Sequence, residues 1–226
     1  HVRSRRQRQM CIRDSVLTGL DRVCSSPDIL ALGTGARVGL FTNFTGTTAT
    51  LGRNIEALLN LGVPLVALFG PEHGLWGSAP AGESEPSSTD EASGLPVVDT
   101  YNVADEGMDA ALSEHDLTHL VVDFQDVGVR FYTYLWTLYD LMASAARLHL
   151  PVIVLDRPNP IAALGPTGPG LAQGITSFVG RVNIPLITGS TIGEMGRHLN
   201  RAWLDGAVDL RVIGLEGWSR ARARGD

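Results

Sequence analysis

Short apolar runs alternate along this chain with longer segments whose apolar residues recur every three or four positions. The short runs are rich in Val, Leu and Ile, as in strands buried on both faces of a parallel sheet, and the longer segments have the period of amphipathic helices. The runs predict strands at residues 38–42, 64–69, 96–98, 117–124, 151–155 and 208–213. The periodic segments predict helices at residues 54–61, 105–114, 134–148 and 191–204. Strands that alternate with helices in this way predict an α/β fold, a parallel sheet with helices on both faces.

Two long segments interrupt this pattern. Residues 74–94 are rich in Gly, Ser, Pro and Glu, and residues 161–180 are rich in Gly and Pro. The first of these segments is predicted to be a long loop, and loops of its length in compact domains are usually binding lids or disordered segments. The helix after the second loop has a start signal, because Thr191 is followed three residues later by Glu194, as in a capping box.

The composition is that of a soluble globular protein, with 44% hydrophobic residues. No apolar run approaches the roughly 20 residues that a membrane span requires, so we expect no span. All 18 basic residues are arginines, and the lack of lysine excludes a P-loop lysine, a Schiff-base lysine and a lysine general base. The two cysteines, Cys11 and Cys24, form no CxxC pair, so they indicate neither a disulfide framework nor a zinc site.

The first fifteen residues differ from the rest of the chain. Residues 1–15 contain five arginines and two glutamines and have no apolar periodicity. They resemble translated sequencing-adapter read-through, and we treat them as a non-native segment outside the fold. A basic arm that binds nucleic acid is the alternative, but without residues 1–14 the chain has a net charge near −10. This acidic remainder argues against nucleic acid as a partner.

Polar side chains follow three of the predicted strands at the point where each strand ends. Glu72 and His73 follow the second strand, residues 123–134 combine carboxylates, an amide, an arginine and tyrosines, and residues 156–160 contain Asp, Arg and Asn. The carboxyl ends of parallel strands meet at one edge of a sheet, where ligands bind in open α/β folds. The sequence therefore predicts one site at this edge.

Carboxylates in these segments are candidates for acid–base chemistry. Glu72 follows a buried strand, where loss of solvent raises a carboxyl pKa and suits a general acid; a Glu tied to loop amides is the alternative. Asp123 and Gln125 point to one side of their strand and Asp126 to the other. We expect one of the two aspartates to pair with Arg130 in a structural role, and the other to serve catalysis or bind sugar hydroxyls.

The remaining candidates each have a structural alternative. Tyr132 is favoured as a residue that contacts a sugar ring, and Tyr134 as a packing residue. Asp156, Arg157 and Asn159 lie in a turn fixed by two prolines, and present polar groups to a ligand unless they form a self-satisfied Asx turn. Glu194 is favoured as the capping partner of Thr191.

Several common site signatures are missing. Residues 33–35 precede a strand, which rules out a dinucleotide fingerprint, and the chain has no GxSxG, HExxH or paired CxxC motif. His115 and His119 lie on either side of a predicted helix end and make a weak metal pair. His149 and His198 are expected on helix surfaces. We therefore predict no metal site.

Seven motifs in a fixed order resemble the exo-β-N-acetylmuramidase NamZ family, also known as DUF1343, from about residue 16 to residue 220. The motifs are Thr42-Asn43-x-Thr45-Gly46, Leu68-Phe69-Gly70-Pro71-Glu72-His73-Gly74, Gly94-Leu95-Pro96-Val97, Gln125-Asp126-Val127-Gly128-x-Arg130-x-Tyr132-Thr133-Tyr134, Leu155-Asp156-Arg157-Pro158-Asn159-Pro160, Ser177-Phe178-Val179-Gly180 and Thr191-x-Gly193-Glu194. The resemblance implies a Rossmann-like catalytic domain, placed at residues 16–213. It also implies a smaller C-terminal domain, of which residues 214–226 are the truncated start.

The resemblance further implies that the protein releases terminal N-acetylmuramic acid from the non-reducing end of peptidoglycan glycans, in cell-wall turnover and recycling, without a cofactor. This substrate favours the cell envelope or the extracellular space, with a cytoplasmic form as the alternative, and the oligomeric state is left open. One departure is that the family has a His-Gly where Thr188-Gly189 stands here. A second is the missing C-terminal domain, which leads us to expect reduced or absent activity.

These observations lead to a mechanistic hypothesis. Glu72 protonates the leaving oxygen, and Asp123, or second in preference Asp126, activates water or stabilises the transition state. Arg130, Asp156 and Asn159 bind sugar hydroxyls and the lactyl carboxylate. Further candidates for substrate binding are Asn43, His73, Gln125, Tyr132, Arg157 and Glu194. The competing hypothesis is a cell-wall sugar-binding module without catalytic activity.

Overall fold

The structure is a computed structural model, and it describes residues 16–220. The predicted non-native segment, residues 1–15, lies outside the described residues. So do residues 221–226, which belong to the predicted start of the C-terminal region.

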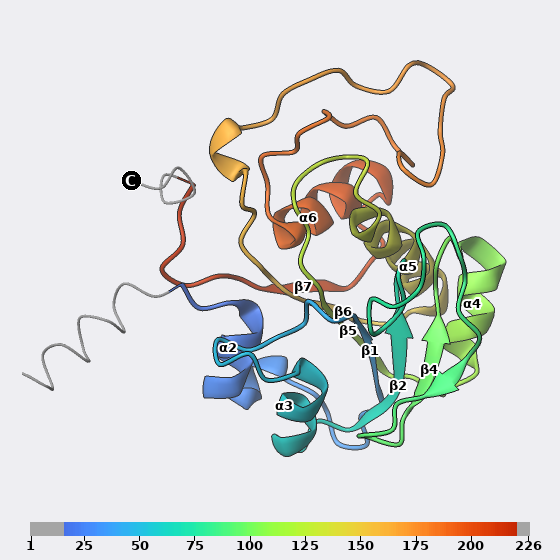
Figure 1. The fold of residues 1–226 in the computed structure, drawn as a ribbon, viewed down its shortest axis with the longest axis vertical. Coiled ribbons are helices and arrows are strands. Elements are labelled where there is room, and N and C mark those ends of the chain that lie inside the picture. Colours follow the sequence, from blue (N-terminus) through green and yellow to red (C-terminus); the bar gives the residue numbers. More distant parts are fainter. Residues whose placement is uncertain (1–15, 221–226) are drawn as a thin grey trace, which may run out of the picture.

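A seven-stranded sheet forms the centre of the molecule (Figure 1). The strands are β1 (Val38–Thr42), β2 (Leu65–Gly70), β3 (Ser88–Thr89), β4 (Pro96–Asp99), β5 (His119–Asp123), β6 (Val152–Leu155) and β7 (Leu210–Ile213). Their order across the sheet is β3-β4-β2-β1-β5-β6-β7, and only the edge strand β3 pairs antiparallel among the ladders of these strands. Without β3, the parallel strands follow the order 3-2-1-4-5-6 of a Rossmann fold. The predicted fold class is confirmed.

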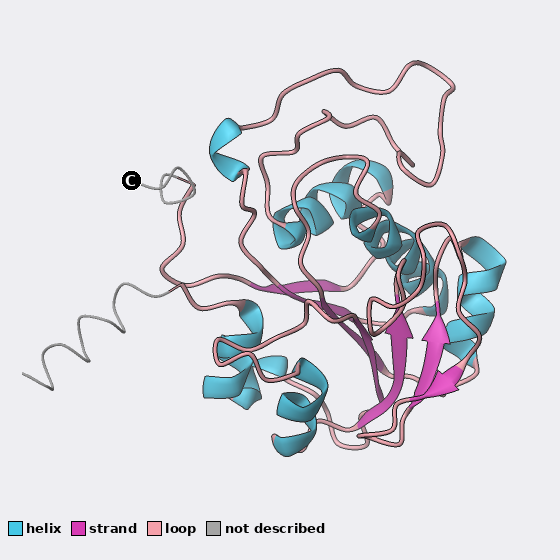
Figure 2. Ribbon diagram, in the orientation of Figure 1, coloured by secondary structure: helices cyan, strands magenta, loops and turns pink. Residues whose placement is uncertain are grey.

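Helices cover both faces of the sheet (Figures 1 and 2). On one face lie α2 (Gly19–Ser25), the 3-10 helix η1 (Pro27–Leu30) and α3 (Asn54–Asn60). On the other lie α4 (Asp105–Ser113), α5 (Tyr134–Leu148) and α6 (Ile192–Trp203). The two cores take alternate residues of the same strands: in β5, Val121 belongs to the first core and Val122 to the second. Because both faces are buried, every residue of β1 is buried, and its sequence is a continuous apolar run.

The longest helix, α5, shows how the sequence pattern becomes packing. Its predicted apolar side is buried, from Leu135 and Leu138 to Ala145. The helix ends at Leu148, and the left-handed backbone of the next residue, His149 (φ 55°), closes the last turn. The chain then reaches Pro151 and enters β6. This short connection brings β6 back beside β5.

Differences from the prediction lie in short elements. The seven-residue helix α2 was not predicted, although Thr18 and Asp21 form a capping box at its start. Residues 88–89 of the first long loop form β3. The second loop contains only the short 3-10 helix η2 (Ala162–Leu164). No helix within residues 16–220 is both long and apolar enough to cross a bilayer.

Candidate active site

The predicted polar segments do converge at the carboxyl ends of the parallel strands. The order of the strands reverses between β1 and β5, the point at which Rossmann-like sheets bind ligands. Thr42 and Asp123 are register partners on these two strands. The Thr42 hydroxyl donates a hydrogen bond of 2.8 Å to the backbone carbonyl of Asp123. Residues that follow β1, β2, β5 and β6 therefore surround one edge of the sheet.

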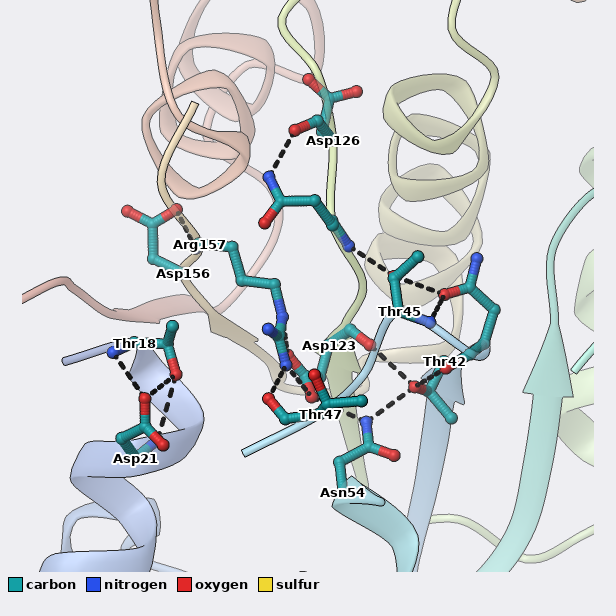
Figure 3. Close-up of polar contacts among 12 residues, drawn as sticks. Thr18, Asp21, Thr42, Thr45, Thr47, Asn54, Asp123, Asp126, Asp156 and Arg157 are labelled. Carbon is teal, nitrogen blue, oxygen red and sulfur yellow. Dashed lines mark hydrogen bonds and ion pairs between the residues drawn. The ribbon is translucent and has the colours of Figure 1, made fainter. Parts of the chain in front are cut away.

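The Asp123 carboxylate is locked in a buried ion pair (Figure 3). Arg157 donates to it through Nε at 2.7 Å and Nη2 at 3.0 Å, and Asn54 donates through Nδ2 at 2.7 Å. Burial lowers the pKa of Arg157, but the adjacent Asp123 outweighs this effect and raises it. Asp123 is 0% exposed. Protein donors thus occupy its oxygens, and this does not fit the role of a catalytic base or of a sugar ligand. The Arg157 guanidinium is likewise occupied by its bonds to Asp123.

Asp156 holds the start of α6. Its Oδ1 accepts the backbone N–H groups of Arg157 (3.0 Å) and Gly193 (2.8 Å), and its Oδ2 accepts the Thr191 hydroxyl at 2.8 Å. Burial raises the pKa of Asp156, while these bonds oppose the shift. Asp156 is thereby a positioning residue that joins the end of β6 to the N-terminus of α6.

Asn159 forms the Asx turn that was the alternative interpretation of this segment. Its Oδ1 accepts the backbone N–H of Ile161 at 2.9 Å, and its Nδ2 donates to the Ser190 carbonyl at 2.8 Å. A Cβ on Gly128 would lie 2.1 Å from Asn159 Nδ2. Only a glycine therefore lets the loop after β5 approach this turn.

Gln125 also connects loops. Its Nε2 donates to the carbonyls of Asp126 (2.6 Å) and Pro158 (2.7 Å), so the segments after β5 and β6 are held together. Its backbone N–H donates to the Thr45 hydroxyl at 2.9 Å. Thr45 in turn donates to Asn43 Oδ1 at 2.6 Å. The Nε2 group of Gln125 thereby stabilises the arrangement of these loops.

Arg130 anchors the second long loop. Its Nη1 donates to the carbonyls of Pro169 (2.8 Å) and Ile184 (2.7 Å). The prediction that Arg130 pairs with Asp123 or Asp126 is wrong, because Asp123 pairs with Arg157 instead. Arg130 is half-buried, and its guanidinium has five N–H donors. Binding of two carbonyls leaves it able to accept an anionic group.

The charges of Glu72 and Asp126 both act on the phenol of Tyr132. Burial raises the pKa of Tyr132, and the charges of Asp126 and Glu72 add to the shift. Glu72 is half-buried: its Oε2 accepts the Thr133 hydroxyl at 2.7 Å, and its Oε1 accepts the Gly82 N–H at 3.3 Å. The Gly82 amide is a loop donor of the kind that the alternative interpretation of Glu72 expected, whereas the Thr133 hydroxyl was not expected. They fix the carboxylate without closing it off from solvent.

Asp126 is the carboxylate with spare hydrogen-bonding capacity. Its Oδ2 accepts the Gly128 N–H at 2.7 Å, whereas its buried Oδ1 has no hydrogen-bond partner within the described part of the chain. Burial raises the pKa of Asp126 to about 7. A carboxyl group that titrates near neutral pH is suited to general acid–base catalysis, and such a group with an unpartnered oxygen indicates a functional site.

The other candidates have mainly local roles. Tyr134 is a packing residue, as predicted, and its ring lies 5.3 Å from that of Phe124. His73 has a left-handed backbone (φ 71°), and its Nδ1 lies 3.1 Å from the carbonyl of Ala79. Glu194 completes the capping box at Thr191, as predicted, and also pairs with Arg220.

Three residues of this network were not among the sequence candidates. Asn54 donates to Asp123, Thr133 donates to Glu72, and Thr188, at the position of the family's His-Gly, donates its N–H to the Gly128 carbonyl at 2.9 Å. Thr133 could have been predicted from the sequence, since it lies inside the family motif at residues 125–134. The Asn54 and Thr188 contacts span 69 and 60 residues of chain and left no local signal.

His115 and His119 have separate local contacts. His115 packs edge-on against Phe69, with ring centroids 5.7 Å apart, and His119 Nδ1 contacts the Thr118 hydroxyl. Residues 16–220 contain no group of three or more His, Cys, Asp or Glu side chains placed to hold a metal.

Comparison with known proteins identifies the family of this chain. Residues 38–224 match the family described as exo-β-N-acetylmuramidase NamZ, N-terminal. The chain belongs to this family. It is 39% identical over 213 residues to the peptidoglycan β-N-acetylmuramidase NamZ of Bacillus subtilis (strain 168), an alignment that covers 94% of this chain and 50% of that protein.

Two crystal structures of DUF1343 family proteins from Bacteroides fragilis NCTC 9343 have the same fold. One is 30% identical, with a TM-score of 0.75, and covers 91% of this chain and 53% of its own. The other is 33% identical, with a TM-score of 0.78, and covers 93% of this chain and 54% of its own. The chain thus spans about half the length of the relatives that it matches.

Proposed function

We propose that this chain carries the catalytic residues of a glycoside hydrolase that releases terminal N-acetylmuramic acid from the non-reducing end of peptidoglycan glycans. The single observation that carries the proposal is the hydrogen bond of 2.7 Å from the Thr133 hydroxyl to Glu72, which joins this carboxylate to the loop after β5 that carries Asp126. The B. subtilis relative is named a peptidoglycan β-N-acetylmuramidase, which supports the choice of substrate.

The proposed reaction uses two carboxyl groups with separate roles. Glu72 gives its proton to the glycosidic oxygen as the bond from that oxygen to C1 of the sugar breaks. A water molecule attacks C1, and Asp126 takes the proton that this water loses. Asp126 replaces Asp123, our first sequence-based choice for this role, because Arg157 and Asn54 already occupy the Asp123 oxygens.

Substrate contacts are assigned to the side chains that the internal network leaves available. We assign Tyr132 and Asn43 to the sugar, and Arg130 to the lactyl carboxylate by a charge-assisted hydrogen bond. His73, at the end of β2 beside Glu72, is kept as a candidate. Gln125, Asp156, Arg157, Asn159 and Glu194 act instead by positioning the loops.

The test uses a full-length relative and compares it with the variant in which Gln replaces the glutamate that corresponds to Glu72. Turnover and affinity are both measured on a chromogenic N-acetylmuramide. Loss of a general acid is expected to lower turnover by about 10²- to 10⁴-fold and to leave affinity nearly unchanged. Glu83→Gln is the matched control, because Glu83 is exposed on the same loop. Unchanged turnover in Glu72→Gln would remove Glu72 from the mechanism. Affinity for the sugar without turnover in the unaltered full-length protein would favour the sugar-binding module.

A further inference from the structure

A small apolar hollow adjoins the candidate site on the side of α3. Phe44, Arg53, Ile55, Leu75 and Trp76 line it, together with Asn43 at the end of β1, and its volume is about 120 Å³. We call it the Trp76 hollow. Pockets that enclose whole small molecules measure about 300–1,000 Å³, so this one is suited to a substituent of a larger ligand.

The hollow has a buried floor and an exposed aromatic rim. Ile55 and Leu75 are buried, whereas Phe44 is 54% exposed and Trp76 is 46% exposed. A Cβ on Gly77 would lie 2.5 Å from the Phe44 ring, so the loop after β2 passes close to Phe44 only because residue 77 is glycine. Large aromatic side chains exposed together beside a pocket indicate a binding surface.

The aromatic rim is held in place by charges that balance one another. The Arg53 guanidinium lies 4.3 Å from the centroid of the Trp76 ring. Arg53 is itself bound by Asp90, which is buried, at 3.2 Å and by Glu56 at 3.4 Å. Because these two carboxylates compensate Arg53, the hollow offers no uncompensated positive charge to an acidic ligand. A neutral ligand fits it better.

The hollow shares residues with the network of the candidate site: Asn54, which binds Asp123, and Asn43, which binds Thr45, both line it. The loop that carries Glu72 also supplies Leu75 and Trp76. Asn43 lines the hollow, and its buried Nδ2, beside the Tyr134 hydroxyl, forms no hydrogen bond of normal geometry within the described residues. Since a general acid protonates the oxygen between two sugars, a second sugar ring must lie within one ring length of Glu72.

We infer that the Trp76 hollow binds the sugar next to the terminal one, and that this sugar is a neutral N-acetylhexosamine. Its ring would lie on the exposed faces of Trp76 and Phe44, since the C–H groups of a sugar face pack well on aromatic rings. The methyl of its acetamido group enters the apolar floor formed by Ile55 and Leu75. This inference rests on the proposed function, because it takes Glu72 as the point of cleavage.

The test uses the Glu72→Gln chain, in which bound glycans stay intact. Isothermal titration compares the methyl β-glycoside of N-acetylmuramic acid with the disaccharide in which N-acetylmuramic acid is β-1,4-linked to N-acetylglucosamine. The disaccharide is expected to bind about tenfold more tightly than the methyl glycoside. Addition of the Trp76→Ala substitution is expected to remove this gain in affinity without changing the affinity for the glycoside. A disaccharide that ends in glucose should gain less, because it lacks the acetamido group. Trp203→Ala is the matched control, because Trp203 is 42% exposed at the end of α6.

A second measurement examines the hollow without the terminal sugar. The indole N–H resonance of Trp76 should shift when methyl β-N-acetylglucosaminide is added, and that of Trp203 should not. A tighter disaccharide complex that does not depend on Trp76, or an indole signal that stays fixed, would overturn the inference while glycoside binding and turnover still support the proposed function. Loss of self-association in Trp76→Ala, with sugar binding unchanged, would show that the hollow is a contact between copies of this chain and also overturn it. Failure of the glycoside to bind would instead count against the proposed function.

Discussion

Asp123 and Arg157 form a two-pronged ion pair beneath the candidate site, with N–O distances of 2.7 and 3.0 Å. The two residues come from the ends of neighbouring strands, β5 and β6, and both are buried. Arg157 also donates to the Thr47 carbonyl at 3.0 Å, so the pair ties the loop after β1 to the same point. One interaction thereby fixes three of the loops that surround Glu72 and Asp126.

Replacement of one partner of this pair should destabilise the fold strongly. Asp123→Leu is expected to lower the free energy of unfolding by about 3–5 kcal/mol, because it leaves the Arg157 charge buried and unpaired. The double substitution Asp123→Leu with Arg157→Met should recover much of the loss. Urea unfolding measures both. Asp109→Ala is the control: it removes the more exposed pair with Arg147 and should change stability by only about 0–1 kcal/mol. A loss in Asp123→Leu as small as that of the control would show that the buried pair does not hold the loops.

The ends of the strands could be predicted from the sequence, but the partners of their side chains could not. Apolar runs that stop at Glu72, Asp123 and Asp156 place all three at one edge of a parallel sheet, as the structure confirms. Whether such a carboxylate is free depends on which donors the fold brings to it. Asn54 reaches Asp123 across 69 residues of chain, and Thr191 reaches Asp156 across 35. No local pattern encodes these contacts.

Local signals succeeded where the partner is close in sequence. The capping box of Thr191 with Glu194, three residues apart, is present as predicted. The Asx turn at Asn159, in which the bonded groups are two residues apart, was a stated alternative and is also present. Strand alternation gives the direction of the Asp123 side chain, but it does not reveal that Arg157 and Asn54 donate to its oxygens.

The raised pKa of Asp126 predicts how stability depends on pH. In the unfolded chain an aspartate loses its proton near pH 3.8, whereas Asp126 in the folded chain keeps it up to about pH 7. Between these values the folded state binds more protons than the unfolded state, so the Asp126 contribution to stability falls as pH rises. Asp126→Asn should therefore stabilise the protein more at pH 8 than at pH 5, by roughly 2–3 kcal/mol.

Urea unfolding of the chain and of Asp126→Asn at both pH values provides this comparison. Asp109→Asn is the control, since hydrogen bonding to Arg147 lowers the pKa of Asp109 and places its titration below both pH values. Its effect should be the same at pH 5 and pH 8. An equally constant effect in Asp126→Asn would mean that Asp126 is already ionised at pH 5.

Two glycines of α6 should respond to alanine in opposite ways. A Cβ on Gly193 would lie 2.5 Å from Val212 Cγ1 and 2.7 Å from the Asp156 carboxyl carbon. Gly193→Ala is thus expected to cost about 1–3 kcal/mol by overpacking. A Cβ on Gly196 meets its nearest neighbour at 3.5 Å, an ordinary contact, so Gly196→Ala should stabilise the helix by about 0.5–1 kcal/mol. Thermal and urea unfolding of the two variants test the close approach of α6 to Asp156, and a neutral Gly193→Ala would contradict it.

Arg130 should control the order of the second long loop. Its guanidinium donates hydrogen bonds to the carbonyls of Pro169, within that loop, and of Ile184, in the irregular segment that follows it. Arg130→Met keeps much of the side-chain volume but removes both hydrogen bonds, so local opening of the loop becomes easier. We expect faster amide hydrogen exchange across residues 165–187, with little change in the exchange of α5. Arg197→Met, on the exposed side of α6, serves as the control. Equally fast exchange in the unaltered chain and in Arg130→Met would show that other contacts hold the loop. That result would favour binding of the lactyl carboxylate as the role of Arg130.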